Sequence, residues 1–334
     1  MDKIRWGILG AARVNERLMP AIVNSEKGEL IAIASRRNDA ARDCLLKHFP
    51  ALEDKVQTFN NFDEVITHKR IDAIYIPLAN EEHTEPALKA IRSKKHLLIE
   101  KPMAIKSSEV ELLISEAKKN NVKIMEGFMY AFHPQFNRMQ DIIRSKILGD
   151  INYAHSMFSF PIQPARFYRI NRAIKNGGGA LWDIGPYAIH TIRQCFQQKP
   201  LRVFALSKLN EYGADISTSG FIDFGNDKRA TFDISFECTR RSEYEVFGPL
   251  GRAKCPIVWQ PDDQIAKIEY TTEKSGVNEE IVPTANHFNI EIDHFNEVIL
   301  NNTHTKLSPD DALWNCKTLE AIQESIETKE WVSI

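Results

Sequence analysis

The stretch that decides the fold is IRWGILGAAR at residues 4–13, where a short apolar strand ends in glycine and a helical pattern follows. Glycine allows a tight turn and close approach of a pyrophosphate, and the helix N-terminus supplies N–H donors. The match to G-x-G-x-x-G is incomplete, because Ala12 and Asn15 occupy the second and third glycine positions. A turn without a ligand is the alternative to a dinucleotide site. The residues predicted to bind the cofactor here are Gly10, Ala11, Ala12 and Arg13.

Short apolar strands alternate with helical patterns from this turn to about residue 125, which is typical of βαβ units around a parallel sheet. The expected strands are 4–9, 30–34, 73–76, 96–99 and 122–125, and the expected helices are 16–24, 39–49, 82–93 and 108–120. Longer alternating segments follow at 152–160, 202–208, 219–224, 229–236 and 244–247, with helices expected at 134–146, 185–195, 290–300 and 309–327.

The predicted fold class is α/β, with an N-terminal Rossmann domain and a C-terminal α+β domain. The first has a doubly wound parallel sheet, and the second has a large, mostly antiparallel open sheet. The predicted boundaries are 1–125 for the NAD(P)-binding Rossmann domain and 126–305 for the substrate and oligomerisation domain. Residues 306–334 form a C-terminal helix that could pack back on the Rossmann domain.

The composition describes an ordinary globular chain of 334 residues, with 43% hydrophobic and 26% charged residues. Its net charge of -2 shows no basic excess, so no nucleic-acid partner is expected. No run approaches the ~18 apolar residues of a membrane span, and no signal peptide is expected. Five scattered cysteines favour reduced thiols and a cytoplasmic location.

The segment after the second strand reads Ser35-Arg36-Arg37-Asn38-Asp39. NAD-binding domains usually carry an acidic residue here for the ribose hydroxyl, whereas arginine forks match a 2′-phosphate. Ser35, Arg36 and Arg37 therefore favour NADP(H) over NAD(H). The alternative is that both arginines are solvated and Asp39 binds the ribose.

Two further groups of polar residues follow strands of the predicted parallel sheet. Glu100-Lys101-Pro102 comes after the fifth strand, at the carboxyl edge where ligands bind in open α/β folds. Proline restricts the backbone of the residue before it. Asn80 and His83 follow the fourth strand, where Asn80 could begin the next helix, and this capping role is compatible with a place in the cofactor cleft.

These motifs together resemble the glucose–fructose oxidoreductase/inositol dehydrogenase family of NAD(P)-dependent oxidoreductases. The resemblance spans essentially the whole chain and rests on residues 7–12, 77–83, 100–102, 126–134 and 177–187. It implies catalysis at the interface of the two domains, on sugars, polyols and related carbinols. It also implies a homodimer or homotetramer formed through the C-terminal sheet.

The segment 177–187, which begins with three glycines and ends in Tyr187, indicates the branch of the family. Tyr187 stands where many members carry a catalytic histidine, which resembles dimeric dihydrodiol dehydrogenases, sugar 1-dehydrogenases and some nucleotide-linked keto-sugar reductases. His190 replaces an acid of the inositol-type pattern, so polyol specificity of that kind is doubtful. Ala131 stands where this branch often has arginine, which changes the charge near the cleft.

The resemblance implies an acid–base pair for hydride transfer. A free phenol has a pKa near ~10, and the ammonium of Lys101 would lower that of Tyr187 while hydrogen-bonding the substrate oxygen. Asp183, four residues earlier on the same helical face, would orient Lys101 or bind a sugar hydroxyl. A core tyrosine is the alternative for Tyr187. The residues expected to line the cofactor cleft are Pro77, Leu78, Asn80, His83, Glu100 and Lys101, and those expected to bind substrate are Lys101, Arg169, Asp183 and Tyr187.

Three functions are compatible with this pattern. The first is an NADP-dependent oxidoreductase acting on a sugar or diol. The second is a reductase of a nucleotide-linked keto-sugar, and the third is a non-catalytic NADP-binding regulator. No metal is expected, because the sequence contains no HExxH motif and no Cys/His cluster.

Overall fold

A computed structural model describes residues 3–259 and 265–334 of the chain. The chain divides into two compact units, each assembled from two segments of sequence. The first unit contains residues 1–128 and 287–313, and the second contains residues 129–286 and 314–334. The predicted fold class is confirmed, because one unit has a parallel sheet and the other a mostly antiparallel one.

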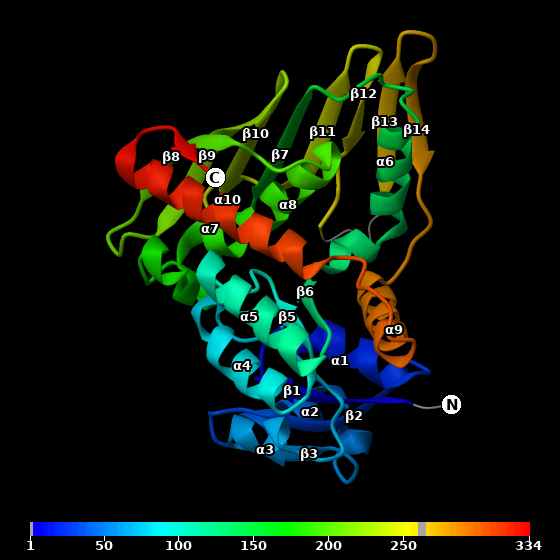
Figure 1. Cartoon of the computed structure of the whole chain (residues 1–334), viewed down its shortest axis with the longest axis vertical. Helices are drawn as coiled ribbons and strands as arrows, with labels where there is room; N and C mark the ends of the chain where they lie inside the picture. Colours follow the sequence, from blue (N-terminus) through cyan, green and yellow to red (C-terminus); the bar gives the residue numbers. More distant parts are fainter. Residues whose placement is uncertain (1–2, 260–264) are drawn as a thin grey trace. The chain divides into compact units, whose positions relative to one another are not determined.

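The sheet of the first unit has six parallel strands in the order β3-β2-β1-β4-β5-β6 (Figure 1). Its strands are β1 (Ile4–Leu9), β2 (Gly28–Ala34), β3 (Gln57–Phe59), β4 (Ala73–Ile76), β5 (His96–Glu100) and β6 (Ile124–Gly127). The order reverses between β1 and β4, and ligands bind outside the carboxyl ends of strands at such a switch point. The residues predicted to bind the cofactor follow β1, β2, β4 and β5.

The helices of this unit are α1 (Asn15–Asn24), α2 (Ala40–His48), α3 (Phe62–Ile66), α4 (Thr84–Arg92), α5 (Ser107–Asn120) and α9 (His287–Leu300). Helix α9 packs on α1 and on the sheet, where Trp6 Nε1 donates to Asn296 Oδ1 over 2.9 Å. The rings of Trp6 and Phe295 are also in contact. This grouping differs from the predicted boundary, which assigned residues 126–305 to the second domain. Local periodicity cannot show which sheet a helix covers.

The sheet of the second unit has nine strands in the order β14-β13-β12-β11-β7-β10-β9-β8-β15. Its strands are β7 (Tyr153–Ser159), β8 (Arg202–Leu209), β9 (Asp215–Gly225), β10 (Lys228–Ser235), β11 (Arg241–Gly248), β12 (Gly251–Cys255), β13 (Lys267–Thr272), β14 (Gly276–Ile281) and β15 (Val332–Ser333). Only β7 and β10 pair in parallel. Asn226 and Asp227 both have positive φ, as a two-residue hairpin turn requires. The sequence prediction missed β12 to β15.

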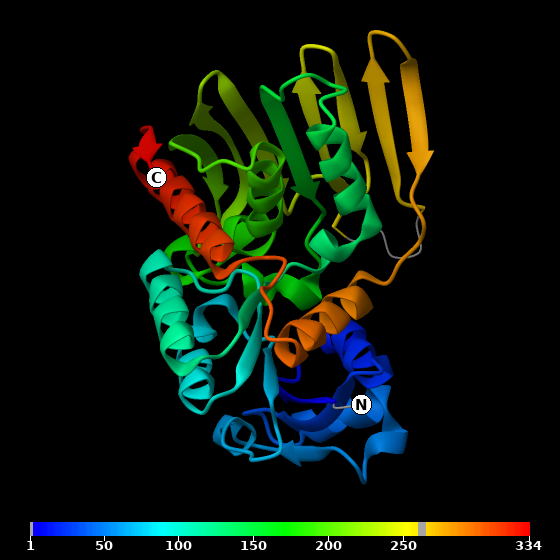
Figure 2. The same ribbon diagram turned by 45° about the vertical axis from the view of Figure 1, so that its right-hand side comes forward.

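Helices cover one face of this sheet, and Figure 2 shows its strands side by side. Helices α6 (Pro134–Arg144) and α8 (Gly185–Phe196) pack on it. In the last helix, α10 (Pro309–Thr328), Ser325 Oγ accepts from the Ala205 amide over 3.0 Å. Residues 314–334 therefore group with the second unit, whereas the prediction allowed them to pack on the Rossmann domain. No helix among the described residues is long and apolar enough to cross a membrane.

Candidate active site

The turn after β1 is built for close approach of a ligand to the backbone. Gly10 has φ +129°, and a Cβ there would lie 3.1 Å from Leu78 Cδ2, so glycine is required. The buried Asn15 donates through Nδ2 to the Gly10 carbonyl over 2.8 Å. This bond gives a physical reason for asparagine at the third glycine position. The turn leads into the N-terminus of α1, so its geometry fits a pyrophosphate.

The loop after β2 is tied to this turn. Arg37 Nη2 donates to the Ala11 carbonyl over 2.8 Å, and the Arg37 amide donates to Ser35 Oγ over 3.2 Å. Arg36 forms an ion pair with Glu82 at 2.7 Å and lies over the Phe62 ring. The structure therefore brings Arg37 next to the predicted phosphate-binding turn, whereas Arg36 contacts the loop after β4 and helix α3.

Buried side chains brace the loop that carries Lys101. His83 is fully buried, with Nδ1 2.9 Å from the Pro102 carbonyl oxygen and Nε2 3.1 Å from the Leu78 carbonyl oxygen. Burial lowers its pKa to about 4, and the positive charge of Lys101 acts in the same direction. His83 is thus neutral at pH 7, so its single N–H donates to one of the two carbonyl oxygens while the ring lies against both loops.

The same loop is held from β6. Glu126 Oε1 accepts from the Met103 amide over 2.7 Å, and the Lys101–Pro102 peptide is cis. Lys101 itself is half-buried at the end of β5. Asn80 begins a short 3₁₀ helix (Asn80–Glu82), and α4 begins at Thr84 with His83 at its N-cap position.

An acidic residue near the predicted site residue Glu100 was missed by the sequence reasoning. Glu100 Oε1 accepts from the Tyr75 hydroxyl over 2.6 Å. Glu291, on α9, is 1% exposed, and burial together with the negative charge of Glu100 raises its pKa well above the usual range. Nothing in the local sequence marks Glu291, because only α9 packing on the first unit brings it near Glu100.

In the second unit, the predicted catalytic tyrosine lies in an aromatic cluster. Tyr187 is in the first turn of α8 and is 8% exposed. Its hydroxyl donates to Met129 Sδ over 3.6 Å, and its ring packs against Phe158 and Trp259. The ring is therefore fixed on several sides, as a general acid–base group requires and as a core tyrosine would also show.

Asp183 and Arg169, both predicted to bind substrate, form an ion pair. Asp183 ends the short helix α7 (Gly179–Asp183) and is 6% exposed, whereas Arg169 ends the 3₁₀ helix η4 (Pro164–Arg169). The guanidinium of Arg169 also lies over the Tyr168 ring. The structure thus pairs Asp183, four residues before Tyr187, with a positive charge from a distant segment.

Gly179, the last of three consecutive glycines at 177–179, is required by a contact with a distant residue. Asp215 Oδ2 accepts from the Leu181 amide and from Thr218 Oγ1, both over 2.8 Å, and so caps α7. Gly179 has φ +91°, and a Cβ there would lie 1.8 Å from Asp215 Oδ1. Burial raises the pKa of Asp215 to about 6. Asp215 was missed by the sequence reasoning because it is 32 residues beyond Asp183 and belongs to β9.

Comparison with known families matches both parts of the chain. Residues 4–128 match the model described as "Oxidoreductase family, NAD-binding Rossmann fold", and residues 136–254 match the GFO/IDH/MocA C-terminal domain. The chain belongs to the GFO/IDH/MocA family of oxidoreductases. The predicted resemblance and the predicted enzyme class are therefore confirmed.

Other members of the GFO/IDH/MocA family align over nearly the whole chain. An uncharacterized oxidoreductase of Rhizobium meliloti is 30% identical, covering 100% of both chains. A D-xylose 1-dehydrogenase (NADP(+)) of Haloferax volcanii is 28% identical over 97% of both chains. The crystal structure of a 3-ketoreductase from Actinomadura kijaniata, in complex with NADP and TDP-benzene, matches with a TM-score of 0.89 and 24% identity over 97% of this chain and 98% of that one.

Among the described residues, no group of three His, Cys, Asp or Glu side chains is arranged to hold a metal ion. All five cysteines are free thiols, and three of them, Cys195, Cys255 and Cys316, are buried. Burial raises the pKa of Cys195 and of Cys255, to about 12 for Cys255, so both are uncharged at neutral pH.

Proposed function

We propose that this GFO/IDH/MocA member is an NADP-dependent oxidoreductase that acts on a carbinol or carbonyl carbon of a sugar or related diol. The observation that carries the proposal is the braced Glu100-Lys101-Pro102 loop at the carboxyl end of β5. A lysine held this way, in a family of oxidoreductases with NAD-binding Rossmann domains, is suited to bind a substrate oxygen.

The preference for NADP rests on the loop after β2. Arg37 lies beside the phosphate-binding turn, Arg36 is paired with Glu82, and the acid expected of an NAD site is absent from Ser35 to Arg37. A 2′-phosphate would compete with Glu82 for Arg36, and guanidinium groups bind phosphate well. The related xylose 1-dehydrogenase is named for NADP(+).

The cofactor would be held by the Gly10–Arg13 turn, by Ser35 to Arg37 and by the loops that contain Pro77, Leu78, Asn80 and Glu100. A bound nicotinamide supplies the hydride donor or acceptor. The protein supplies orientation, and the 2.6 Å hydrogen bond from Tyr75 fixes one carboxyl oxygen of Glu100.

For the acid–base step, we assign Tyr187 as the group that takes the proton from the carbinol oxygen or returns it to the carbonyl oxygen. The ammonium of Lys101 would stabilise the phenolate and hydrogen-bond the same substrate oxygen. Asp183, paired with Arg169, would bind a sugar hydroxyl. Low exposure of Tyr187 and Asp183 supports these roles, because exclusion of water strengthens charge interactions.

A reductase of a nucleotide-linked keto-sugar is the second candidate. The segment 164–172 contains Arg166, Arg169 and Arg172, and guanidinium groups match a diphosphate. The 3-ketoreductase was solved with TDP-benzene, a nucleotide-linked compound. A non-catalytic regulator would need neither Lys101 nor Tyr187, and both residues are present.

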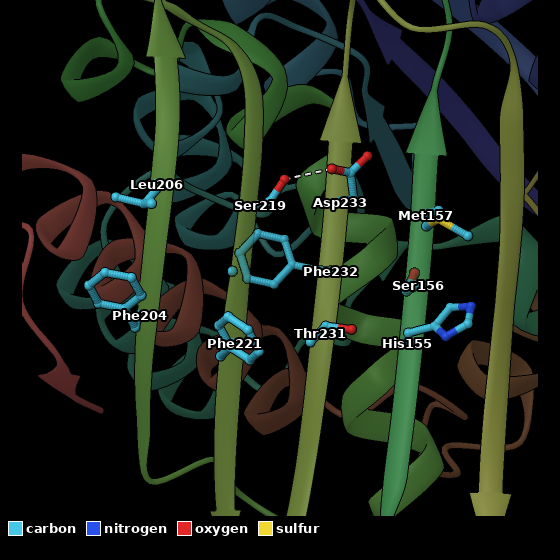
Figure 3. Close-up of a pocket in the computed structure, with 11 residues that line it drawn as sticks. His155, Ser156, Met157, Phe204, Leu206, Ser219, Phe221, Thr231, Phe232 and Asp233 are labelled. Carbon is cyan, nitrogen blue, oxygen red and sulfur yellow. Dashed lines mark hydrogen bonds between the residues drawn. The ribbon is translucent and has the colours of Figure 1, made fainter.

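The open face of the nine-stranded sheet supports a homo-oligomer (Figure 3). A hollow of about 390 Å³ lies over β7 to β10 and is lined by apolar side chains such as Phe204, Met157 and Phe232. Leu206 and Phe221 beside it are 57% and 55% exposed. An apolar patch of this kind favours a second copy of the sheet. We expect light scattering after size exclusion to give at least a dimer, and Phe221→Asp to give monomer; a monomeric wild type would refute this assembly.

Free thiols support a cytoplasmic location.

The first test is titration of the purified protein with NADPH and NADH, followed by nicotinamide fluorescence. We expect tighter binding of NADPH, and Arg36→Asp should weaken it about tenfold, the loss of one charge-assisted contact. Arg42→Ala is the control. Arg42 is an exposed arginine of α2, and it is paired with Glu53, which follows that helix. Preference for NADH would overturn the assignment of NADP as the cofactor. Failure to bind either nucleotide would overturn the proposal that the protein is an oxidoreductase.

A screen of sugars, diols and nucleotide-linked keto-sugars then distinguishes the candidate substrates. Lys101→Ala and Tyr187→Phe should lose turnover while still binding nucleotide. Turnover of nucleotide-linked substrates alone would establish the second candidate. Full activity of both variants would refute the assigned acid–base pair.

A further inference from the structure

A buried chain of hydrogen bonds lies one helical turn after Tyr187. His190 and Thr191 are three and four residues further along α8, so they share a face with Tyr187. Tyr130, in the 3₁₀ helix η3 (Met129–Phe132), reaches this face: its hydroxyl oxygen is 2.5 Å from His190 Nδ1 and 2.9 Å from Thr191 Oγ1. Trp259 Nε1 donates to Thr191 Oγ1 over 3.1 Å. The four side chains joined by these hydrogen bonds are each at most 1% exposed.

The direction of these bonds follows from the chemistry of the groups. An indole N–H can only donate, so the Thr191 oxygen is an acceptor from Trp259. The single Thr191 proton serves either Tyr130 Oη or the Tyr187 carbonyl oxygen, which is 2.8 Å away. The Tyr130 proton goes to His190 Nδ1 in the tautomer that carries its proton on Nε2, the ring nitrogen 3.4 Å from the Gln194 side-chain amide. The indole N–H of Trp259 and the hydroxyl protons of Thr191 and Tyr130 therefore each have an acceptor.

Members of this chain also contact Tyr187. The Tyr130 and Tyr187 rings pack edge to face with centroids 6.1 Å apart, and the Trp259 ring lies 6.3 Å from Tyr187. Ring packing sets separation but leaves sliding motions open, whereas hydrogen bonds fix the position of each ring. The groups that restrain Tyr130 and Trp259 therefore restrain the two rings beside Tyr187.

We propose that Tyr130 and Thr191 are positioning residues that hold the Tyr187 ring for proton transfer, with His190 as the buried acceptor that orients Tyr130. This inference rests on the proposed function of Tyr187. Proton transfer requires its partners at hydrogen-bond distance, and a shift of about 1 Å can cost about a hundredfold in rate.

The test compares variants that remove a hydroxyl with variants that keep it. Tyr130→Phe and Thr191→Val delete one oxygen each with little change in shape, whereas Thr191→Ser retains the hydroxyl. Tyr244→Phe is the matched control, since the Tyr244 hydroxyl is fully buried in the same unit and hydrogen-bonds Cys255. For each variant we would measure kcat and KM on a substrate turned over by the wild type, NADPH affinity and the thermal unfolding midpoint.

We expect Tyr130→Phe and Thr191→Val each to lower kcat about tenfold, the effect of one hydrogen bond, with KM within about twofold. Thr191→Ser and Tyr244→Phe should stay within about twofold in kcat, and NADPH affinity should be unchanged in all four. Unchanged kcat in the first two variants, while Tyr187→Phe is inactive, would overturn the inference and leave the proposed function standing. A loss that vanishes once activity is divided by the folded fraction would overturn it as well.

A crystal structure of Tyr130→Phe provides a readout that needs no substrate. We expect the Tyr187 ring to be displaced or to occupy more than one position. A single Tyr187 position identical to that in a crystal structure of the wild type would refute the positioning role, whatever the enzyme acts on. Full activity of Tyr187→Phe would instead refute the acid–base role of Tyr187, whether or not the ring moves in Tyr130→Phe.

Discussion

The two units hold their candidate site residues by different means. In the first unit, His83 and Glu126 bond to main-chain atoms of a loop, the Pro102 carbonyl and the Met103 amide. In the second unit, Tyr187 lies on a helix whose main chain is already hydrogen-bonded. There the contacts run between side chains, as in the 2.5 Å bond of Tyr130 to His190.

The difference follows from the backbone. A loop has no repeating hydrogen-bond pattern, so its shape depends on side chains that bind its carbonyl and amide groups. A helix fixes its own main chain and leaves only side-chain positions to be set by packing. Loss of a brace in the first unit should therefore change stability and cofactor binding together. Loss of a hydroxyl in the second unit should change turnover more than stability.

The largest expected effect is a loss of activity when Lys101 is replaced. His83 and Glu126 hold the loop that carries this lysine. Lys101→Ala should lower kcat by at least about a hundredfold, because the proposed mechanism assigns to Lys101 both the charge that stabilises the phenolate and a hydrogen bond to the substrate. Lys106→Ala, an exposed lysine five residues later, should leave kcat within about twofold. Steady-state kinetics on the best substrate checks both. Equal losses in the two variants would remove the distinction between the braced lysine and its exposed neighbour.

The next effect is on stability, where the Asp215 side chain holds the main chain of α7 in the second unit. Gly179→Ala should lower the free energy of unfolding by about 2–4 kcal/mol, because it combines a clash with Asp215 and a strained φ. Gly276→Ala is the control: its φ is +58° but a Cβ there meets nothing within 4 Å, so about 1 kcal/mol is expected. Urea denaturation measures both. Equal costs would mean that the Asp215 cap does not require glycine.

The brace in the first unit gives the third prediction. His83→Ala should lower the free energy of unfolding by about 1–3 kcal/mol, since it deletes a buried hydrogen-bonding side chain. It should also weaken NADPH binding about tenfold by loosening the loops at Leu78 and Pro102. His304→Ala, an exposed histidine of the same unit, should change neither quantity. Destabilisation without weaker NADPH binding would contradict the linkage of the two loops to the cofactor.

The smallest effect is a pH dependence at Asp215. Its pKa is about 6 in the folded protein against 3.8 for a free carboxyl, so the folded state binds the proton more tightly. Ionisation of Asp215 therefore costs stability above pH 6, and this cost disappears as the pH falls toward 4. Relative to Asp215→Asn, the wild type should gain about 1–2 kcal/mol between pH 7 and pH 5. Parallel stability curves for the two proteins over this range would refute the raised pKa.

The sequence by itself determined the features that depend on residues close together in the chain. The strand at Ile4–Leu9, the glycine turn and the following helix are visible in one run of residues, and the structure has them there. The hairpin turn at Asn226 and Asp227 is likewise a local feature, because both residue types tolerate positive φ. Periodicity and turn chemistry are local properties, so they could be identified from the sequence.

Tertiary structure alone decided the features that depend on distant partners. Helix α9 has the same apolar pattern whichever unit it covers, and its packing on α1 brings Glu291 under the influence of Glu100. The short strands β12 to β15 were missed because their pairing, rather than their own sequence, makes them strands. Asp215 caps a helix from another element, and Tyr130 meets His190 across 60 residues. Contacts of this kind come from packing energy between elements, which no local pattern encodes.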